Sequence, residues 1–209
     1  WAVCFLIYYI KSVVGGTVTL HRLLTHRSFK APKWFEYLGT LLAIPGTTVP
    51  VLYWVAIHRT HHRYSDTEKD PHSPLIFGYV PVQFRLTPTM PRLEYVPDIL
   101  KSKFHMNMLQ YHWLYTILVG VVIYFIDPYA VVYAYLAPSL ILQHASSMVN
   151  TLTHSRLGYR NFETRDQSVN NFFVGYFHGG EGWHNNHHAN ASDPQFGKKR
   201  WEFDPGYHL

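Results

Sequence analysis

One stretch of apolar sequence, broken only by a short turn, decides the fold of this chain. Residues 111–149 read YHWLYTILVGVVIYFIDPYAVVYAYLAPSLILQHASSMV. The run 111–126, with a few flanking residues, approaches the roughly 20 apolar residues that cross a bilayer. Because only Asp127-Pro128-Tyr129 separates it from the second run, we predict membrane helices near 108–126 and 130–149, joined as a hairpin. The alternative is a soluble helical protein with two buried core helices.

Two more apolar segments precede this hairpin. Residues 1–20 are mostly apolar and predict another membrane segment. Residues 34–57 are interrupted by Pro45 and Pro50, which disfavour a straight spanning helix, so we predict an interfacial or re-entrant segment near 34–57. Since the sequence starts at Trp1 inside an apolar run, we expect an N-terminal membrane helix to be missing.

The basic residues orient the predicted hairpin. Its turn contains no Lys or Arg, whereas both flanks contain several: Arg85, Arg92, Lys101 and Lys103 before it, and Arg156, Arg160, Arg165, Lys198, Lys199 and Arg200 after it. The excess of positive charge places both flanks in the cytoplasm. We therefore expect a multi-pass integral membrane protein whose all-α helical bundle carries a cytoplasmic helical cap.

Composition narrows the possible partners. The 209 residues suit one domain, 1–209, with a formal charge of +5. Its single cysteine, Cys4, excludes an intrachain disulfide. The basic residues do not form a patterned patch with stacking aromatic residues, which excludes nucleic acid as a partner. Attraction to an anionic lipid bilayer or to an acidic electron donor fits the charge better.

Three dense histidine clusters stand out among the 15 histidines. They are His21-Arg-Leu-Leu-Thr-His26, His58-Arg-Thr-His61-His62 and His184-Asn-Asn-His187-His188. Such clusters indicate metal binding. On an α-helix, residues four apart lie about 40° apart on one face, so the outer histidines of the second and third clusters can grip one metal each. The histidine at the fourth position of these clusters can reach a neighbouring metal.

The spacing predicts a dinuclear centre but leaves the metal open. Eight clustered histidines are too many for one zinc site, and the absence of cysteine among them excludes an iron–sulfur cluster. Imidazole suits iron, copper, nickel and zinc alike. Acidic residues near the clusters are candidates for orienting the imidazole rings. These are Asp66, Glu68, Asp70, Glu181 and Asp193.

At this point the sequence resembles a known family. The three clusters match, in order and spacing, the histidine boxes of the membrane fatty acid desaturases. The first box lies in Gly16-Thr17-Val18-Thr19-Leu20-His21-Arg22 followed by Thr25-His26-Arg27-Ser28-Phe29, and Gly180-Glu181-Gly182-Trp183 precedes the third. Both stretches resemble the delta-9 branch, closer to its bacterial and cyanobacterial acyl-lipid members than to the acyl-CoA branch.

The resemblance implies a set of ligands for two iron ions. Val149-Asn150-Thr151-Leu152-Thr153-His154 matches a fourth ligand segment, in which His154 is a direct ligand and Asn150 holds a metal-bound water. One iron is implied to take His21, His26, His58, His62 and His187. The other is implied to take His61, His154, His184 and His188.

The resemblance also implies a reaction. It is the O2-dependent introduction of a cis double bond, at the delta-9 position, into a saturated acyl chain during fatty acid biosynthesis. Electrons are implied to come from ferredoxin or cytochrome b5, because the sequence has no haem-binding or flavin motif. The substrate is an acyl lipid, an acyl-CoA or an acyl carrier, and the catalytic histidines face the cytoplasm.

The sequence departs from the family pattern, including that of the acyl-CoA branch, at several positions. Ala56 and Ile57 stand where that branch has an Arg-Asp pair that helps to hold the CoA head group, which favours a glycerolipid-bound chain. Ser147 replaces a tryptophan of the substrate tunnel. Two other functions stay open: a diiron membrane hydroxylase acting on a lipid, and a non-catalytic membrane protein that binds or transports metal.

Overall fold

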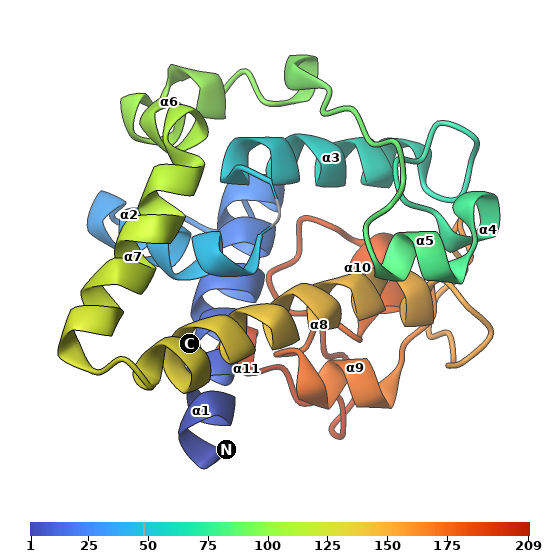
Figure 1. The fold of residues 1–209 in the computed structure, drawn as a ribbon. Coiled ribbons are helices and arrows are strands. Elements are labelled where there is room, and N and C mark those ends of the chain that lie inside the picture. The colour runs from blue at the N-terminus through green and yellow to red at the C-terminus, as the bar shows by residue number, and fades with distance from the viewer. Residues whose placement is uncertain (48) are drawn as a thin grey trace.

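The computed structural model describes residues 1–47 and 49–209, which form a helical assembly without strands, apart from isolated bridges that pair Asn170 with Tyr159 and Trp183 (Figure 1). The all-α prediction is therefore confirmed. The longer helices are α1 Ala2–Ile10, η1 Lys11–His26, α2 Lys33–Ala43, α3 Val51–Tyr64, α6 Lys103–Gln110, α7 His112–Ile126 and α8 Ala137–Thr153. The short ones are η2 Ile44–Gly46, α4 Pro74–Phe77, α5 Tyr79–Gln83, η3 Leu93–Tyr95, η4 Ile99–Lys101, η5 Val131–Leu136, α9 Phe172–Phe177, α10 His184–Ala189 and α11 Pro205–His208.

The first helix is longer than the predicted segment 1–20. Helices α1 and η1 continue into one another from Ala2 to His26, and these 25 residues are long and apolar enough to cross a membrane. The η1 part is wound as a π-helix, in which hydrogen bonds join residues five apart. The hydroxyls of Thr19 and Thr25 follow this winding, since each donates to the carbonyl five residues before it, at 2.8 and 2.7 Å.

Two bent helix pairs could each form a further span. The helical segments Lys33–Gly46 and Val51–Tyr64 are bent by 85° relative to one another, so the chain from 34 to 57 is interrupted; Pro45 lies near the end of the first segment and Pro50 directly precedes the second. Helices α6 and α7 meet at 78°. By length and composition the described residues thus offer one span, or up to three if each bent pair counts as one. The multi-pass topology stays a prediction.

Two helices joined by a short turn occupy the region of the predicted hairpin, but only α7, taken together with α6, is among the candidate spans, so the membrane hairpin stays a prediction. Helix α7 ends at Ile126, and the chain returns through η5 into α8 after a turn at Asp127. The Tyr135 hydroxyl donates to the Thr116 carbonyl at 2.5 Å, which ties the two arms together. Large apolar side chains at the turn, such as Phe125 at 81% exposure, face outward. Such a surface suits lipid better than water.

A tightly packed interior holds the histidine-bearing helices in place. Helix α2 packs closely on η1 at Gly39, where a β-carbon would clash with the Thr19 side chain. The core around Leu20, Val55 and Ala56 joins η1 to α3. This packing fixes the two helices that carry the first two histidine clusters.

The loop before α10 is fixed by a similar close approach. A β-carbon on Gly182 would lie 2.1 Å from the Gly175 nitrogen, so the loop can reach α9 only with glycine there. The indole of Trp183, fully buried, donates to the Phe203 carbonyl at 2.8 Å. The third cluster thus begins from a rigid anchor.

Candidate metal centre

Two groups of histidines converge inside the molecule, and every member offers one ring nitrogen within 4.8 Å of the others in its group. Group A consists of His21, His26, His58, His62 and His187. Group B consists of His61, His154, His184 and His188. Helices α3 and α10 contribute to both groups, whereas η1 contributes only to group A and the end of α8 only to group B. The structure therefore gathers the predicted histidines into two sites side by side.

The nitrogen atoms of group A have the spacing of metal ligands. The Nε2 atoms of four rings form a closed cycle with edges of 2.9, 3.0, 3.0 and 3.1 Å, in the order His58, His21, His187 and His62. Imidazole nitrogens bind a transition metal at about 2.0–2.1 Å, so neighbouring ligands at right angles lie about 3 Å apart. The cycle therefore fits a single bound ion.

The inward-facing nitrogens of group B lack hydrogen-bond partners among the described residues. They are Nε2 of His61, His154 and His188 and one nitrogen of His184, both of whose ring nitrogens lack a partner. A buried polar atom without a partner costs about 1–3 kcal/mol. Several such atoms around one point are chemically reasonable if a metal ion satisfies them. Group B therefore also fits a metal ion.

Carboxylates hold four of these rings from behind. The pairs join Nδ1 to carboxylate oxygen: His61 with Asp70 at 2.9 Å, His154 with Asp66 at 2.9 Å, His188 with Asp166 at 2.7 Å and His21 with Glu181 at 2.5 Å. In a neutral ring, this contact keeps the proton on Nδ1 and leaves the lone pair of Nε2 directed at the centre. The carboxylates thereby fix both the tautomer and the orientation of the rings.

The electrostatics of these carboxylates differ between the groups. Burial opposes ionisation of Asp166, but hydrogen bonds from His188, Ser168 and Thr164 hold the pKa of its carboxyl well below the usual range. Burial raises the pKa of Glu181 to about 7, against the opposing effect of the nearby Arg22. Group B thus has a firmly anionic support, whereas group A has a weaker one.

The predicted ring-orienting acids are only partly brought to the site. Asp66, Asp70 and Glu181 contact histidines, as given above. Asp193 instead pairs with Lys198 at 2.6 Å, because the turn after α10 carries it toward the following loop. Glu68 is exposed. The sequence did not predict a role for Asp166, because Asp166 has no regular spacing from a histidine cluster. The one nearby feature in the sequence that hints at a held carboxylate is the pair Thr164 and Ser168, whose hydroxyls donate to Asp166.

Three other polar residues near the site have distinct positions. Asn150 lies in α8 one turn before His154 and lines the adjoining cavity, outside the two groups of converging nitrogens. The ring of His72, for which no role was predicted, lies 4.6 Å from that of His61. His144 lies apart from both groups, near Gln83 and Phe84.

The π-helical winding of η1 explains how His21 and His26 can bind at one site. His21 and His26 are five residues apart, which on an α-helix is about 140° of rotation. In a π-helix, residues five apart lie on adjacent turns of one face. Both histidines therefore reach group A from the same helix.

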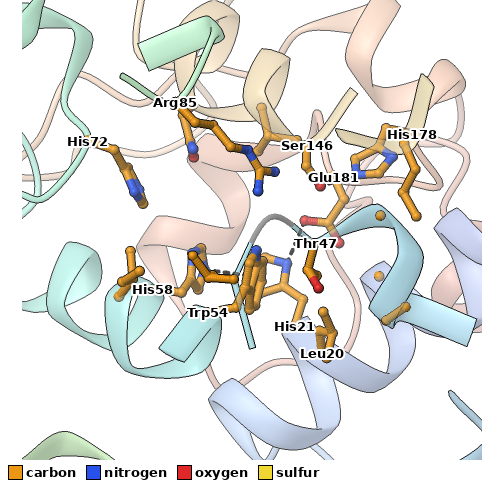
Figure 2. A pocket seen from close by; sticks show the side chains of 18 of the residues that line it. Leu20, His21, Thr47, Trp54, His58, His72, Arg85, Ser146, His178 and Glu181 are labelled. Carbon is orange, nitrogen blue, oxygen red and sulfur yellow. Dashed lines mark hydrogen bonds and ion pairs between the residues drawn. The ribbon is translucent and has the colours of Figure 1, made fainter. Parts of the chain in front are cut away.

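A cavity of about 210 Å³ adjoins group A. Figure 2 shows His21 and His58 on one side, with Arg85, Ser146 and His178 across from them. Apolar side chains supply much of the remaining lining: Leu20, Trp54, Ile57, Val82, Leu142 and Val149. The cavity thus joins an apolar space directly to histidine rings.

Comparison with known proteins gives consistent matches over this chain. The model of a family described as fatty acid desaturase matches residues 1–197. An acyl-CoA C20 Delta5-desaturase of Anemone leveillei is 34% identical over 99% of this chain and 68% of its own length. An sn-1 stearoyl-lipid 9-desaturase of Anabaena variabilis is 33% identical over 98% of this chain and 78% of its own length. Delta-9 acyl-lipid desaturase 1 of Arabidopsis thaliana is 35% identical, with 98% and 69% covered. The chain spans about two thirds of the length of the first of these relatives.

Proposed function

Because the chain belongs to the fatty acid desaturase family, whose members are oxidoreductases that act on acyl chains, we propose that it introduces a cis double bond into an acyl chain with two bound irons. The observation that carries this proposal is the pair of converging histidine groups beside an apolar cavity. A protein that only stores or transports metal has no use for an apolar space against its ligands.

We assign one iron to group A and the other to group B. Two irons held there would supply the O2-dependent oxidation that removes hydrogen from an unactivated methylene. The chain itself contributes ligand geometry through α3 and α10, which serve both groups, and ring orientation through the carboxylates. The position of Asn150, one turn before His154, supports the proposed role of its side chain in holding a water beside group B.

The cavity is the proposed site of the acyl methylenes. Leu20, Trp54 and Leu142 offer apolar contacts to a hydrocarbon chain. His21 and His58 lie on its wall, so a chain within it passes next to group A. Asn150 lines the same cavity, which brings the chain close to group B as well.

Positions 56 and 57 favour an acyl chain esterified to a lipid. Ala56 is fully buried and Ile57 lines the cavity, so neither position offers a cation to a CoA phosphate. Two of the relatives above are named acyl-lipid or stearoyl-lipid desaturases. We therefore propose an acyl lipid as substrate and the delta-9 position as the site of reaction, with acyl-CoA or an acyl carrier as the competing donors.

We further propose that the enzyme lies in the membrane with both histidine groups on the cytoplasmic side. The helix Ala2–His26 supports this, because the histidines lie toward its C-terminal end and its N-terminal part is apolar and outward-facing. The basic flanks of the hairpin support the same orientation. Electrons would then reach the site from the cytoplasm.

Expression of the full-length protein in a host that makes only saturated fatty acids tests the proposal. We expect a new cis-9 monoene in the membrane lipids and close to two irons per purified chain. When the cells are fed a labelled saturated fatty acid, we expect the labelled monoene to appear first in the glycerolipids. A hydroxy fatty acid in place of the alkene would assign the hydroxylase reaction instead. Bound metal without a lipid product would assign a non-catalytic role.

A further inference from the structure

A compact cluster of cations surrounds one tyrosine at the end of α3. The guanidinium carbons of Arg63 and Arg92 lie 5.8 and 5.5 Å from the ring centre of Tyr64, and Lys69 Nζ lies 5.6 Å from it. Arg63 also lies 5.5 Å from the ring of Tyr95, whose hydroxyl is 3.3 Å from that of Tyr64. We call these five residues the cationic cluster.

The charge of this cluster is not neutralised by ion pairs within the described chain. Arg63, Lys69 and Arg92 take part in none of the described ion pairs, and Arg63 and Lys69 are exposed. The nearby Asp98 already pairs with Arg27 at 2.6 Å and with Arg59 at 2.7 Å. The two acids of the same loops, Glu68 and Glu94, are exposed and form none of these pairs either.

The cluster lies next to both metal groups in the chain. Arg63 follows His62 of group A directly, and His61 of group B comes one residue earlier on the same helix. Lys69 precedes Asp70, whose carboxylate holds the His61 ring. A partner bound at the cluster is therefore separated from either group by little more than the last turn of α3.

The cluster also faces away from the apolar end of the first helix. Figure 1 shows α3 across the top of the molecule, whereas the N-terminus of α1 lies at the bottom. Since the Ala2–His26 helix enters the membrane through its N-terminal part, the cluster lies on the side that a water-soluble protein can reach. The position does not suit a contact with lipid head groups beside α1.

The proposed reaction requires electrons that this chain does not supply. Conversion of a CH2–CH2 unit to CH=CH removes two electrons and two protons, while the reduction of O2 to two waters takes four electrons and four protons. Two electrons and two protons must therefore come from outside. Ferredoxin-like carriers deliver one electron per encounter, so each turnover needs two encounters at a surface near the metals.

We propose that the cationic cluster is the docking site for an acidic one-electron carrier protein. This inference rests on the proposed function. Three cations around two tyrosine rings, whose hydroxyls are in contact, attract an anionic surface and offer it aromatic contact area. Because Arg63 and Lys69 are exposed and Arg92 is only half-buried, the attraction acts mainly on the association rate and weakens with salt.

Charge reversal tests the proposal in the full-length enzyme in lipid nanodiscs. The Arg63→Glu/Lys69→Glu/Arg92→Glu variant should raise the KM for reduced plant ferredoxin at least about tenfold at low salt, and the difference should shrink at high salt. Turnover driven by reduced methyl viologen, which needs no docking surface, should stay within about twofold. The matched control reverses Lys103, Arg165 and Arg200, which are also exposed and carry the same charge change.

Further variants distinguish the outcomes. Glu68→Gln/Glu94→Gln should lower the KM for ferredoxin, because it removes negative charge beside the cluster. If the triple reversal fails to accumulate, Arg63→Gln/Lys69→Gln/Arg92→Gln should still raise the KM. An unchanged KM, or an equal loss of turnover with ferredoxin and viologen, would overturn the docking site. Absence of alkene from the unaltered enzyme with both reductants would instead remove the proposed function.

Discussion

Group A and group B bring similar rings together by different means. Three of the four rings in group B contact a carboxylate through Nδ1, at 2.7–2.9 Å. Among the residues that the structure describes, His21 alone in group A has such a contact. Two other rings of group A have aromatic neighbours instead: Trp54 stacks on His58 with centroids 5.1 Å apart, and Phe196 lies 4.3 Å from His187.

Two metals bound at these groups would therefore have unequal environments. A carboxylate behind an imidazole makes it a stronger donor, so a metal in group B would be the more electron-rich of the two. Aromatic packing fixes a ring without changing its basicity. The ring orientations of group B therefore depend mainly on carboxylate contacts, and those of group A more on aromatic packing. Substitutions can perturb the two kinds of support separately.

Removal of a ligand should have the largest effect. His154→Ala should abolish desaturation and reduce the iron content from two to about one per chain, because group B would keep only three rings. Elemental analysis and fatty acid profiles measure both quantities. His144→Ala, in the same helix, should retain activity. A folded His154→Ala protein with two irons would remove His154 from the proposed ligand set.

Loss of a carboxylate from group B should have the next largest effect. Asp70→Asn keeps the shape but weakens the support of His61, so metal affinity at group B should fall about 10- to 100-fold. Chelator competition measures this affinity. The control is Asp193→Asn, because Asp193 pairs with Lys198. Equal affinities for the two variants would mean that charge does not hold group B.

The corresponding change in group A should be milder. Glu181→Gln should weaken metal binding less than about tenfold, the lower end of the range for such partners, since four of the five rings have no carboxylate to lose. The same chelator titration, run beside Asp70→Asn, compares the groups directly. If Glu181→Gln proves the more damaging of the two, the contrast between the groups is reversed.

The smallest effect should come from the aromatic support. Phe196→Leu removes the ring against His187 and the contact with Arg22, whose guanidinium lies 3.9 Å from its centre. Aromatic contacts contribute about 0.5–1.5 kcal/mol each, so the free energy of unfolding should fall by about 1–3 kcal/mol. Chemical denaturation measures this free energy, and Phe203→Leu, at a half-exposed position, is the control. A larger loss of metal affinity than for Asp70→Asn would contradict the prediction.

The sequence predicts the helical class and the convergence of the histidines, because helical spacing is a local property. The four-residue spacing of His58 and His62 predicts one shared face, and both rings lie in group A. The support of His188 by Asp166 is different: the contact forms only when the irregular segment between α8 and α9 folds back over α10. No spacing rule predicts such a contact.

Local rules also fail where the backbone departs from the α-helix. The spacing of His21 and His26 is out of phase for an α-helix, and only the π-helical winding of η1 brings them together. Asp193 fails for the opposite reason: it is near the third cluster in sequence, but the turn after α10 takes it to Lys198. Nearness along the chain therefore predicts ring support only where the intervening backbone is regular.

The continuous helix Ala2–His26 has a consequence for the choice of membrane. Its apolar part is long enough to cross a bilayer, and its last turns carry two of the five rings of group A. A helix adjusts to bilayer thickness by tilting. Because the helix is continuous, a tilt of its lipid-facing part would also move His21 and His26. The thickness of the surrounding bilayer would therefore affect the positions of these two rings in group A.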